Sequence, residues 1–107
     1  MPGDYQLYLG YFVAFVFATG VIVNLVGPAG IRDGYKRWGY PPYFRFVTAA
    51  LEGLALVLIV IDSTRVAGLA LAALIMLAAI VTLVRASEAK HAIPAFVVMI
   101  AAILAAI

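Results

Sequence analysis

The sequence predicts an all-α integral membrane protein whose single domain, residues 1–107, is a four-helix transmembrane bundle. Of its 107 residues, 67% are hydrophobic and 11% are charged, whereas a soluble domain is roughly half apolar and a quarter charged. The apolar residues gather in four long tracts with almost no charge, as bilayer spans require. No Lys or Arg precedes the first tract, so we expect a retained helix rather than a cleaved signal peptide.

Each apolar tract predicts one crossing of the bilayer. The tracts place helices near residues 5–27, 43–61, 64–84 and 92–107. The second and fourth tracts are short for a hydrocarbon core of roughly 30 Å, so flanking aromatic residues or local thinning of the bilayer would complete these crossings. The connection Asp62–Arg65 is long enough only for a tight turn, in which Ser63 or Thr64 would cap the third helix.

Basic residues are distributed unevenly among the connections. Arg32, Lys36, Arg37 and Arg45 lie in or beside the first, Arg85 and Lys90 in the third, and Arg65 alone in the second. With four crossings the first and third connections share a side, which the positive-inside rule assigns to the cytoplasm. We therefore expect a multi-pass protein of the cell inner membrane with both termini outside the cytoplasm. The basic residues are explained by topology and by contact with anionic membrane lipid, so we expect no nucleic-acid binding.

The first connection, residues 27–42, is rich in Gly and Pro but contains a helical pattern. Ile31, Tyr35 and Trp38 recur at helical spacing, which predicts a short amphipathic segment lying in the membrane interface. Trp38 and Tyr40 belong to an aromatic cluster typical of an interfacial belt. A lid over a cavity on the cytoplasmic side is the alternative interpretation.

Glu52 is the only acidic residue inside a predicted span, where an uncompensated charge costs at least about 2.5–3.5 kcal/mol. We therefore expect Glu52 to face the bundle interior. Arg45 lies two helical turns earlier on the same face, with Thr48 between them. Alternative partners are Lys36, Arg37 and Asn24. Two roles stay open: a buried carboxylate that sets helix packing, or an acid that binds a ligand or carries a proton.

The candidate site is built around Glu52 as the catalytic acid. The candidate ligand-binding residues are polar or aromatic side chains near the predicted cytoplasmic half: Asn24, Lys36, Trp38, Tyr40, Arg45, Thr48 and Thr82. Cysteine is absent, and the only histidine, His91, lies in a polar connection, so we predict no metal site. No nucleotide-binding fingerprint is present, and the sequence identifies no cofactor.

Several short motifs lie between residues 34 and 84: Lys36, Gly39-Tyr40-Pro41, Leu51-Glu52-Gly53, Ala67-Gly68-Leu69 and Met76-Leu77-Ala78-Ala79. They resemble the DoxX-like family of small four-helix bacterial membrane proteins. The resemblance implies a membrane bundle with Glu52 and Lys36 as its polar focus, in a family named after a subunit associated with quinone-linked thiosulfate oxidation. Many members carry a histidine after the small-residue run of the third helix. This chain has Val81-Thr82-Leu83-Val84 there, which argues against a histidine-dependent redox role.

Three functions are compatible with these features. The leading hypothesis is binding of a lipophilic small molecule, with a quinone as one candidate, as accessory to a redox system with an oxidoreductase partner. The second is a membrane enzyme, a cyclase or isomerase, that uses Glu52 as an acid on an isoprenoid-like substrate. The third is a structural subunit of a larger membrane complex or homo-oligomer.

Overall fold

The computed structural model describes residues 4–107, and every regular element within them is helical. The four long helices are α1 (Asp4–Val26), α3 (Phe44–Val60), α4 (Arg65–Arg85) and α5 (Ile93–Ala106). The short elements are α2 (Ala29–Arg37) and the 3-10 turns η1 (Asp62–Thr64) and η2 (Ala89–Ala92). Each end of the four predicted helices falls within one residue of its expected position, and α2 occupies the predicted amphipathic segment.

Three stretches are long and apolar enough to cross a membrane, namely Asp4–Val26, Asp62–Arg85 and Ala89–Ala106. Helix α3 has 17 residues, about 25 Å at about 1.5 Å per residue, which is shorter than a hydrocarbon core of roughly 30 Å. Large apolar side chains nevertheless cover the outside of all four long helices, including Phe15, Leu54, Leu74 and Val97, each more than half exposed. Such an extensive exposed apolar surface is favourable in contact with lipid and unfavourable in water.

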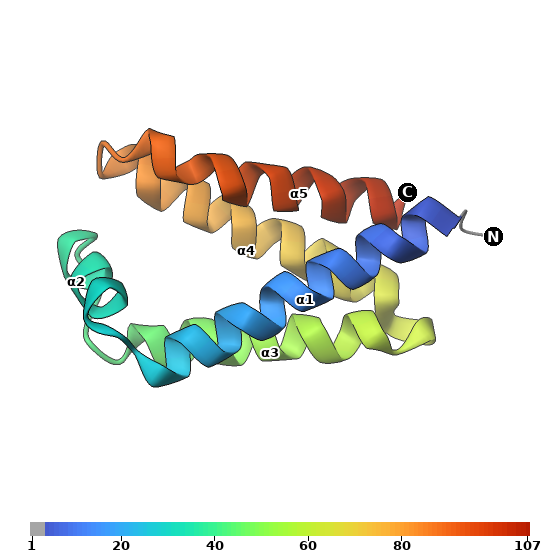
Figure 1. Ribbon diagram of the computed structural model, residues 1–107, viewed down its shortest axis with the longest axis horizontal. Coiled ribbons are helices and arrows are strands. Elements are labelled where there is room, and N and C mark those ends of the chain that lie inside the picture. The colour runs from blue at the N-terminus through green and yellow to red at the C-terminus, as the bar shows by residue number, and fades with distance from the viewer. Residues whose placement is uncertain (1–3) are drawn as a thin grey trace.

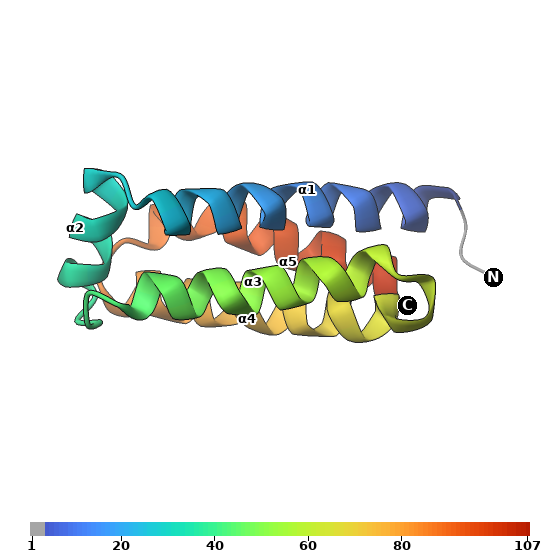
Figure 2. The ribbon, with the colours of Figure 1, turned by 90° about the horizontal axis from the view of Figure 1, so that it is seen from below.

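The long helices run roughly along one axis and form a ring of contacts (Figures 1 and 2). Helix α1 packs against α3 and α5, and α4 packs against the same two helices. Helix α2 and η2 lie together at one end of the molecule, whereas η1, the start of α1 and the end of α5 lie at the other. The first and third connections therefore share an end, as the predicted topology requires.

The helices α3 and α4 pack most closely near η1. Gly68 of α4 lies so near α3 that an added Cβ would be 2.7 Å from the backbone nitrogen of Ile59 and 2.8 Å from Cβ of Leu58. From this contact the two helices diverge toward the end where α2 lies (Figure 1). The axes of α3 and α4 therefore form a wedge that is narrow at η1 and wide near α2.

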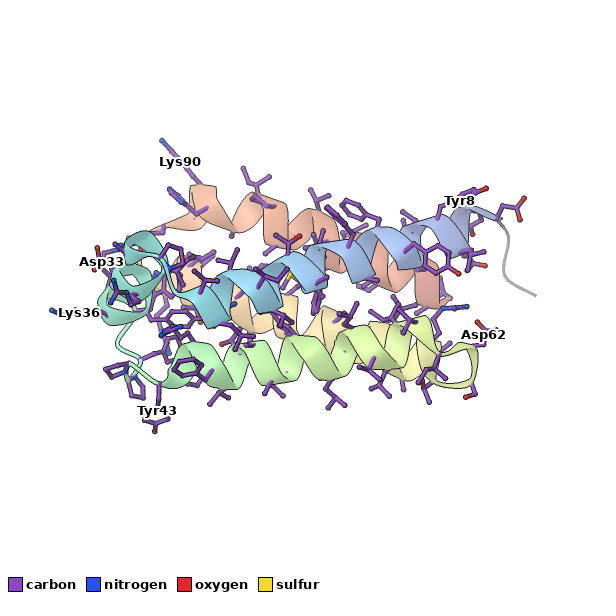
Figure 3. All side chains as sticks on the ribbon, turned by 60° about the horizontal axis from the view of Figure 1, so that its bottom comes forward. Tyr8, Asp33, Lys36, Tyr43, Asp62 and Lys90 are labelled. Carbon is purple, nitrogen blue, oxygen red and sulfur yellow. The ribbon has the colours of Figure 1, made fainter. Side chains whose placement is uncertain are left out.

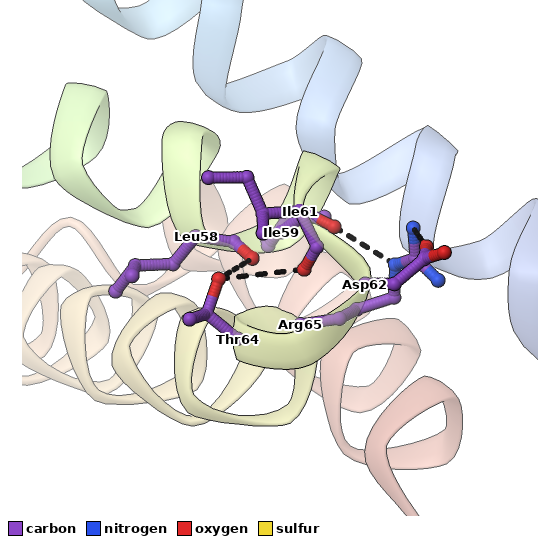
Figure 4. A network of polar contacts seen from close by, with 6 residues as sticks. All are labelled: Leu58, Ile59, Ile61, Asp62, Thr64 and Arg65. Atoms are coloured by element: carbon purple, nitrogen blue, oxygen red, sulfur yellow. Dashed lines mark hydrogen bonds and ion pairs between the residues drawn. The ribbon is translucent and has the colours of Figure 1, made fainter.

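The turn at η1 satisfies the free carbonyl groups at the end of α3 (Figure 4). Thr64 Oγ1 donates to the carbonyl of Leu58 at 2.8 Å, and Arg65 Nε donates to that of Ile59 at 2.8 Å. Arg65 Nη2 also forms an ion pair with Asp62 at 2.7 Å. Thr64 occupies the N-cap position of α4, as expected, but its hydroxyl makes no capping bond to α4. It bonds backward instead, to carbonyls of α3 that have no intrahelical partner.

The apolar core lies where the four long helices meet. Its buried members are mostly small or aliphatic: Val13, Ala14, Phe17, Ala55, Ile59, Leu69, Ala72, Val98, Ala101 and Ala102. Small residues allow helix backbones to approach closely, which is how helices gain packing energy in a membrane. Among the buried polar residues, Asn24 and Thr82 lie near the α2 end, Glu52 lies at the middle of α3, and Gln6 lies near the opposite end.

Substitution of Gly68 by Ala should destabilise the α3–α4 hairpin. The added methyl group meets backbone of α3 rather than a movable side chain, so we expect a loss of about 1–3 kcal/mol. The matched control is Gly53→Ala, whose Cβ would lie 3.9 Å from Val21 Cγ2, an ordinary contact. Thermal unfolding in detergent, followed by circular dichroism, should show a lower Tm for Gly68→Ala only. Equal Tm values for the two variants would contradict the close contact.

Candidate functional site

A cavity of about 450 Å³ lies in the wedge between α2, α3 and α4. Its aromatic wall consists of Tyr35, Trp38, Tyr40 and Phe44. Its aliphatic wall comes mainly from α4 and includes Leu71, Leu74, Ile75, Met76, Ala79 and Leu83, and its polar side chains are Thr48, Glu52 and Thr82. Leu51 and Leu74 in its lining are 41% and 63% exposed, so the cavity reaches the outer surface between α3 and α4.

Glu52 is 7% exposed, and its interior position agrees with the sequence analysis. Asn24 of α1 donates through Nδ2 to Glu52 Oε1 at 2.9 Å and to the carbonyl of Gly20 at 2.9 Å. Tyr35 of α2 donates its hydroxyl to Asn24 Oδ1 at 2.7 Å. Burial raises the pKa of Tyr35 above its ordinary value, which keeps this hydroxyl a donor. The amide of Asn24 therefore joins α1, α2 and α3 at one point.

Gly20 allows the Glu52 carboxylate to lie against α1. A Cβ added at Gly20 would clash with the carboxylate of Glu52. Gly20 and Asn24 are one helical turn apart, so the space and the hydrogen-bond donor are presented on the same face of α1. Gly20 and Asn24 thus form the surface of α1 against which Glu52 packs.

The expected pairing of Glu52 with Arg45 or Lys36 is wrong for the described residues 4–107. Arg45 Nη1 donates to the carbonyls of Asn24 and Leu25 at 2.7 and 2.9 Å, where the end of α1 leaves carbonyls without intrahelical partners. Lys36 is exposed and points away from the helices (Figure 3). Arg45 lies about 10 Å along the helix from Glu52 at about 1.5 Å per residue, so the carbonyls of α1 are the nearer partners.

Three side-chain contacts hold the first connection over the end of the cavity. Trp38 Nε1 donates to Glu88 Oε2 at 3.0 Å, and Arg37 forms an ion pair with Glu88 Oε1 at 3.0 Å. The hydrogen bond from Arg37, and after it the one from Trp38, lowers the pKa of Glu88 below its ordinary value. The hydroxyls of Tyr40 and Thr82 are hydrogen-bonded at 2.7 Å. These contacts place α2 and the segment after it beside the cavity, and the interpretation of this segment as a lid stays a prediction.

The structure divides the predicted site residues between two places. The cavity is lined by Glu52, Trp38, Tyr40, Thr48 and Thr82. Asn24 lies outside this lining and donates a hydrogen bond to Glu52. Lys36 and Arg45 line a neighbouring groove between α2 and the start of α3, which shares Tyr40 with the cavity. The sequence analysis did not assign Tyr35 and Phe44 to the site. The helical spacing of Tyr35 with Ile31 and Trp38 was the available signal for Tyr35, because it placed this ring on the apolar face of α2.

The chemistry of the cavity suits a lipophilic molecule with a polar head. Tyr40 and Phe44 stack with their ring centroids 4.4 Å apart and their planes 7° apart, so they form one stacked pair in the aromatic wall of the cavity. The carboxyl of Glu52 and the hydroxyls of Thr48 and Thr82 provide hydrogen-bonding groups in an otherwise apolar lining. Within residues 4–107, no three His, Asp or Glu side chains form a group that could hold a metal ion.

Substitution of Asn24 by Ala should destabilise the protein by about 1–3 kcal/mol, because it leaves the Glu52 carboxylate and the Tyr35 hydroxyl without their partner. Thr19→Ala is the control on the same helix, since that exposed hydroxyl bonds only to the carbonyl of Phe15. Thermal unfolding should give a lower Tm for Asn24→Ala and little change for Thr19→Ala. An unchanged Tm for Asn24→Ala would exclude the Asn24 amide as the junction of the three helices.

Comparison with known proteins gives one match. The family model described as the DoxX-like family matches residues 8–106, nearly the whole chain. Neither the search of curated proteins nor that of solved structures found a match. The match agrees with the motifs in α2, α3 and α4 and with the helices that are able to span a membrane. The chain is therefore a multi-pass membrane protein that belongs to the DoxX-like family.

Proposed function

We propose that this protein binds a lipophilic small molecule of the quinone type in the cavity between α2, α3 and α4, as accessory to a redox system. The observation that carries the proposal is the cavity itself: about 450 Å³ of largely apolar space with the buried carboxyl of Glu52 in its wall. Small-molecule sites typically have volumes of roughly 300–1,000 Å³ and a few polar groups in an apolar lining.

A quinone head matches the distribution of groups in this lining. Its flat ring would stack on the aromatic wall formed by Tyr40 and Phe44. Its oxygen atoms would accept hydrogen bonds from the hydroxyls and from the protonated carboxyl of Glu52, and its tail would leave past Leu51 and Leu74 into lipid. Because reduction of a quinone consumes protons, Glu52 is suited to exchange them, while the electrons would come from an oxidoreductase partner.

The proposal includes α3 as a fourth membrane-spanning helix, so that the domain is a four-helix transmembrane bundle of the bacterial inner membrane. The arrangement supports this, because α3 packs against both α1 and α4 and lies roughly along the same axis as the other long helices (Figures 1 and 2). The α2 end contains most of the basic residues, whereas Arg65 at the other end is paired with Asp62. By the positive-inside rule, the α2 end faces the cytoplasm and both termini lie outside it.

The second candidate function is catalysis by a cyclase or isomerase. The observation that favours it is the cavity lining, which combines four aromatic rings with one acid, Glu52. Aromatic faces stabilise positive charge, and a carboxylic acid can protonate an isoprenoid-like substrate. Turnover of a bound isoprenoid by the purified protein would favour the enzyme, and binding without turnover would favour the quinone site.

Trp38 allows a direct test of ligand binding, because it is the only Trp in the chain and it lines the cavity. Quinones quench indole fluorescence on contact, so titration with a decyl-substituted benzoquinone should quench Trp38 saturably. Ala79→Phe, which fills the cavity from α4, should abolish the saturable component. Ala70→Phe, at an exposed position on the same helix, should retain it. Equal quenching in both variants would mean that the quinone only partitions into lipid.

Substitution of Glu52 by Gln should separate function from packing. The amide keeps an oxygen that can accept the bond from Asn24, so we expect a Tm within a few degrees of the original protein. It cannot donate the proton of a carboxylic acid to a quinone oxygen, so we expect quinone affinity to fall by about tenfold, the equivalent of about one hydrogen bond. Fluorescence titration and thermal unfolding of the same sample measure both. Unchanged affinity would remove Glu52 from the ligand site.

A further inference from the structure

A second hollow of about 790 Å³ lies between α2 and the start of α3, and its lining differs from that of the cavity. Three basic residues line this groove: Arg32, Lys36 and Arg45. Asp33 is the one acid beside them, so positive charge dominates. Asp33, Lys36 and Tyr43, all of which line the groove, lie at the α2 end of the molecule (Figure 3). This charge does not contribute to the proposed quinone site.

Two of the basic side chains are available to a ligand. Arg32 and Lys36 are exposed and one helical turn apart, so they lie on the same face of α2. In the described part of the chain neither forms an ion pair, whereas Arg37 on the same helix is paired with Glu88. Arg45 is half-buried, and its Nη1 atom holds the end of α1. These bonds hold the Arg45 cation in place. Because a guanidinium carries five N–H donors, Arg45 keeps further donors for a ligand.

The groove continues into an apolar surface along α3. Phe46 lines the groove and is 47% exposed. Leu54 and Val57 follow it on the same outer face of α3 and are also exposed. Positive charge next to an exposed apolar strip is complementary to an anionic headgroup with an acyl chain, and the strip would have no role in binding a free anion.

We infer that this groove is a binding site for an anionic phospholipid. Its phosphodiester would contact Arg32, Lys36 and Arg45, and one acyl chain would lie along Phe46, Leu54 and Val57. Tyr35 and Tyr40 line both this groove and the cavity, so the lipid would lie against the aromatic wall of the proposed ligand site. The inference is independent of the identity of the ligand in the cavity.

Native mass spectrometry of the delipidated protein tests the inference with two lipids of identical acyl chains, phosphatidylglycerol and phosphatidylcholine. The original protein should retain one phosphatidylglycerol more tightly than phosphatidylcholine. R32Q/K36Q should weaken that binding roughly 30-fold, since each cation near an anionic surface contributes about fivefold. Both residues are exposed and outside any ion pair in residues 4–107, so the Tm should be unchanged.

The matched control is R85Q/K90Q, which removes two exposed cations from the same end of the molecule but from outside the groove. This variant should keep the phosphatidylglycerol preference. Equal losses in the two double variants would mean that the lipid responds only to overall charge, and no loss in R32Q/K36Q would exclude the groove; either result overturns the inference. Displacement of the lipid by millimolar inorganic phosphate would also overturn it, because it would identify a site for free phosphate.

Discussion

Burial of the Glu52 carboxylate is the constraint on which the α2 half of this membrane protein depends. A carboxylate inside a span needs a hydrogen-bond donor, and the donor here is the amide of Asn24 on α1. That amide can serve only because Gly20, one turn earlier, leaves room for the carboxylate. The same amide accepts a bond from Tyr35. One polar contact thus determines how α1 lies against α3 and where α2 begins to cover them.

The packing of α3 against α4 explains why a cavity lies beside this carboxylate. Gly68 brings the two helices into near backbone contact at η1, and from there they diverge toward α2. The rings of α2 and of the following segment occupy the open end, and the bonds from Trp38 and Arg37 to Glu88 hold them there. The wedge is therefore closed at one end by small residues and at the other by aromatic ones, with Glu52 in its wall.

Positive charge at the α2 end is divided among three uses. Arg45 binds carbonyls at the end of α1, and Arg37 binds Glu88. Arg45 meets carbonyls that have no intrahelical partner, and Arg37 binds the Glu88 carboxylate together with Trp38. Arg32 and Lys36 have no such contact in the described chain and line the groove. A count of basic residues cannot distinguish these uses, although each one contributes equally to the predicted membrane orientation.

The sequence by itself determined the helices and the burial of Glu52. Helix ends follow from local hydrophobicity and breaking residues, so α1, α3, α4 and α5 end within one residue of the predicted positions. The interior position of Glu52 follows from the energetic cost of a charge in lipid. Only the tertiary structure decided that Asn24 and not Arg45 binds Glu52, and that Tyr35 and the aliphatic face of α4 complete the cavity. Partners on different helices depend on how those helices rotate and tilt against one another, and this geometry arises from packing at contacts such as Gly68 rather than from spacing along one helix.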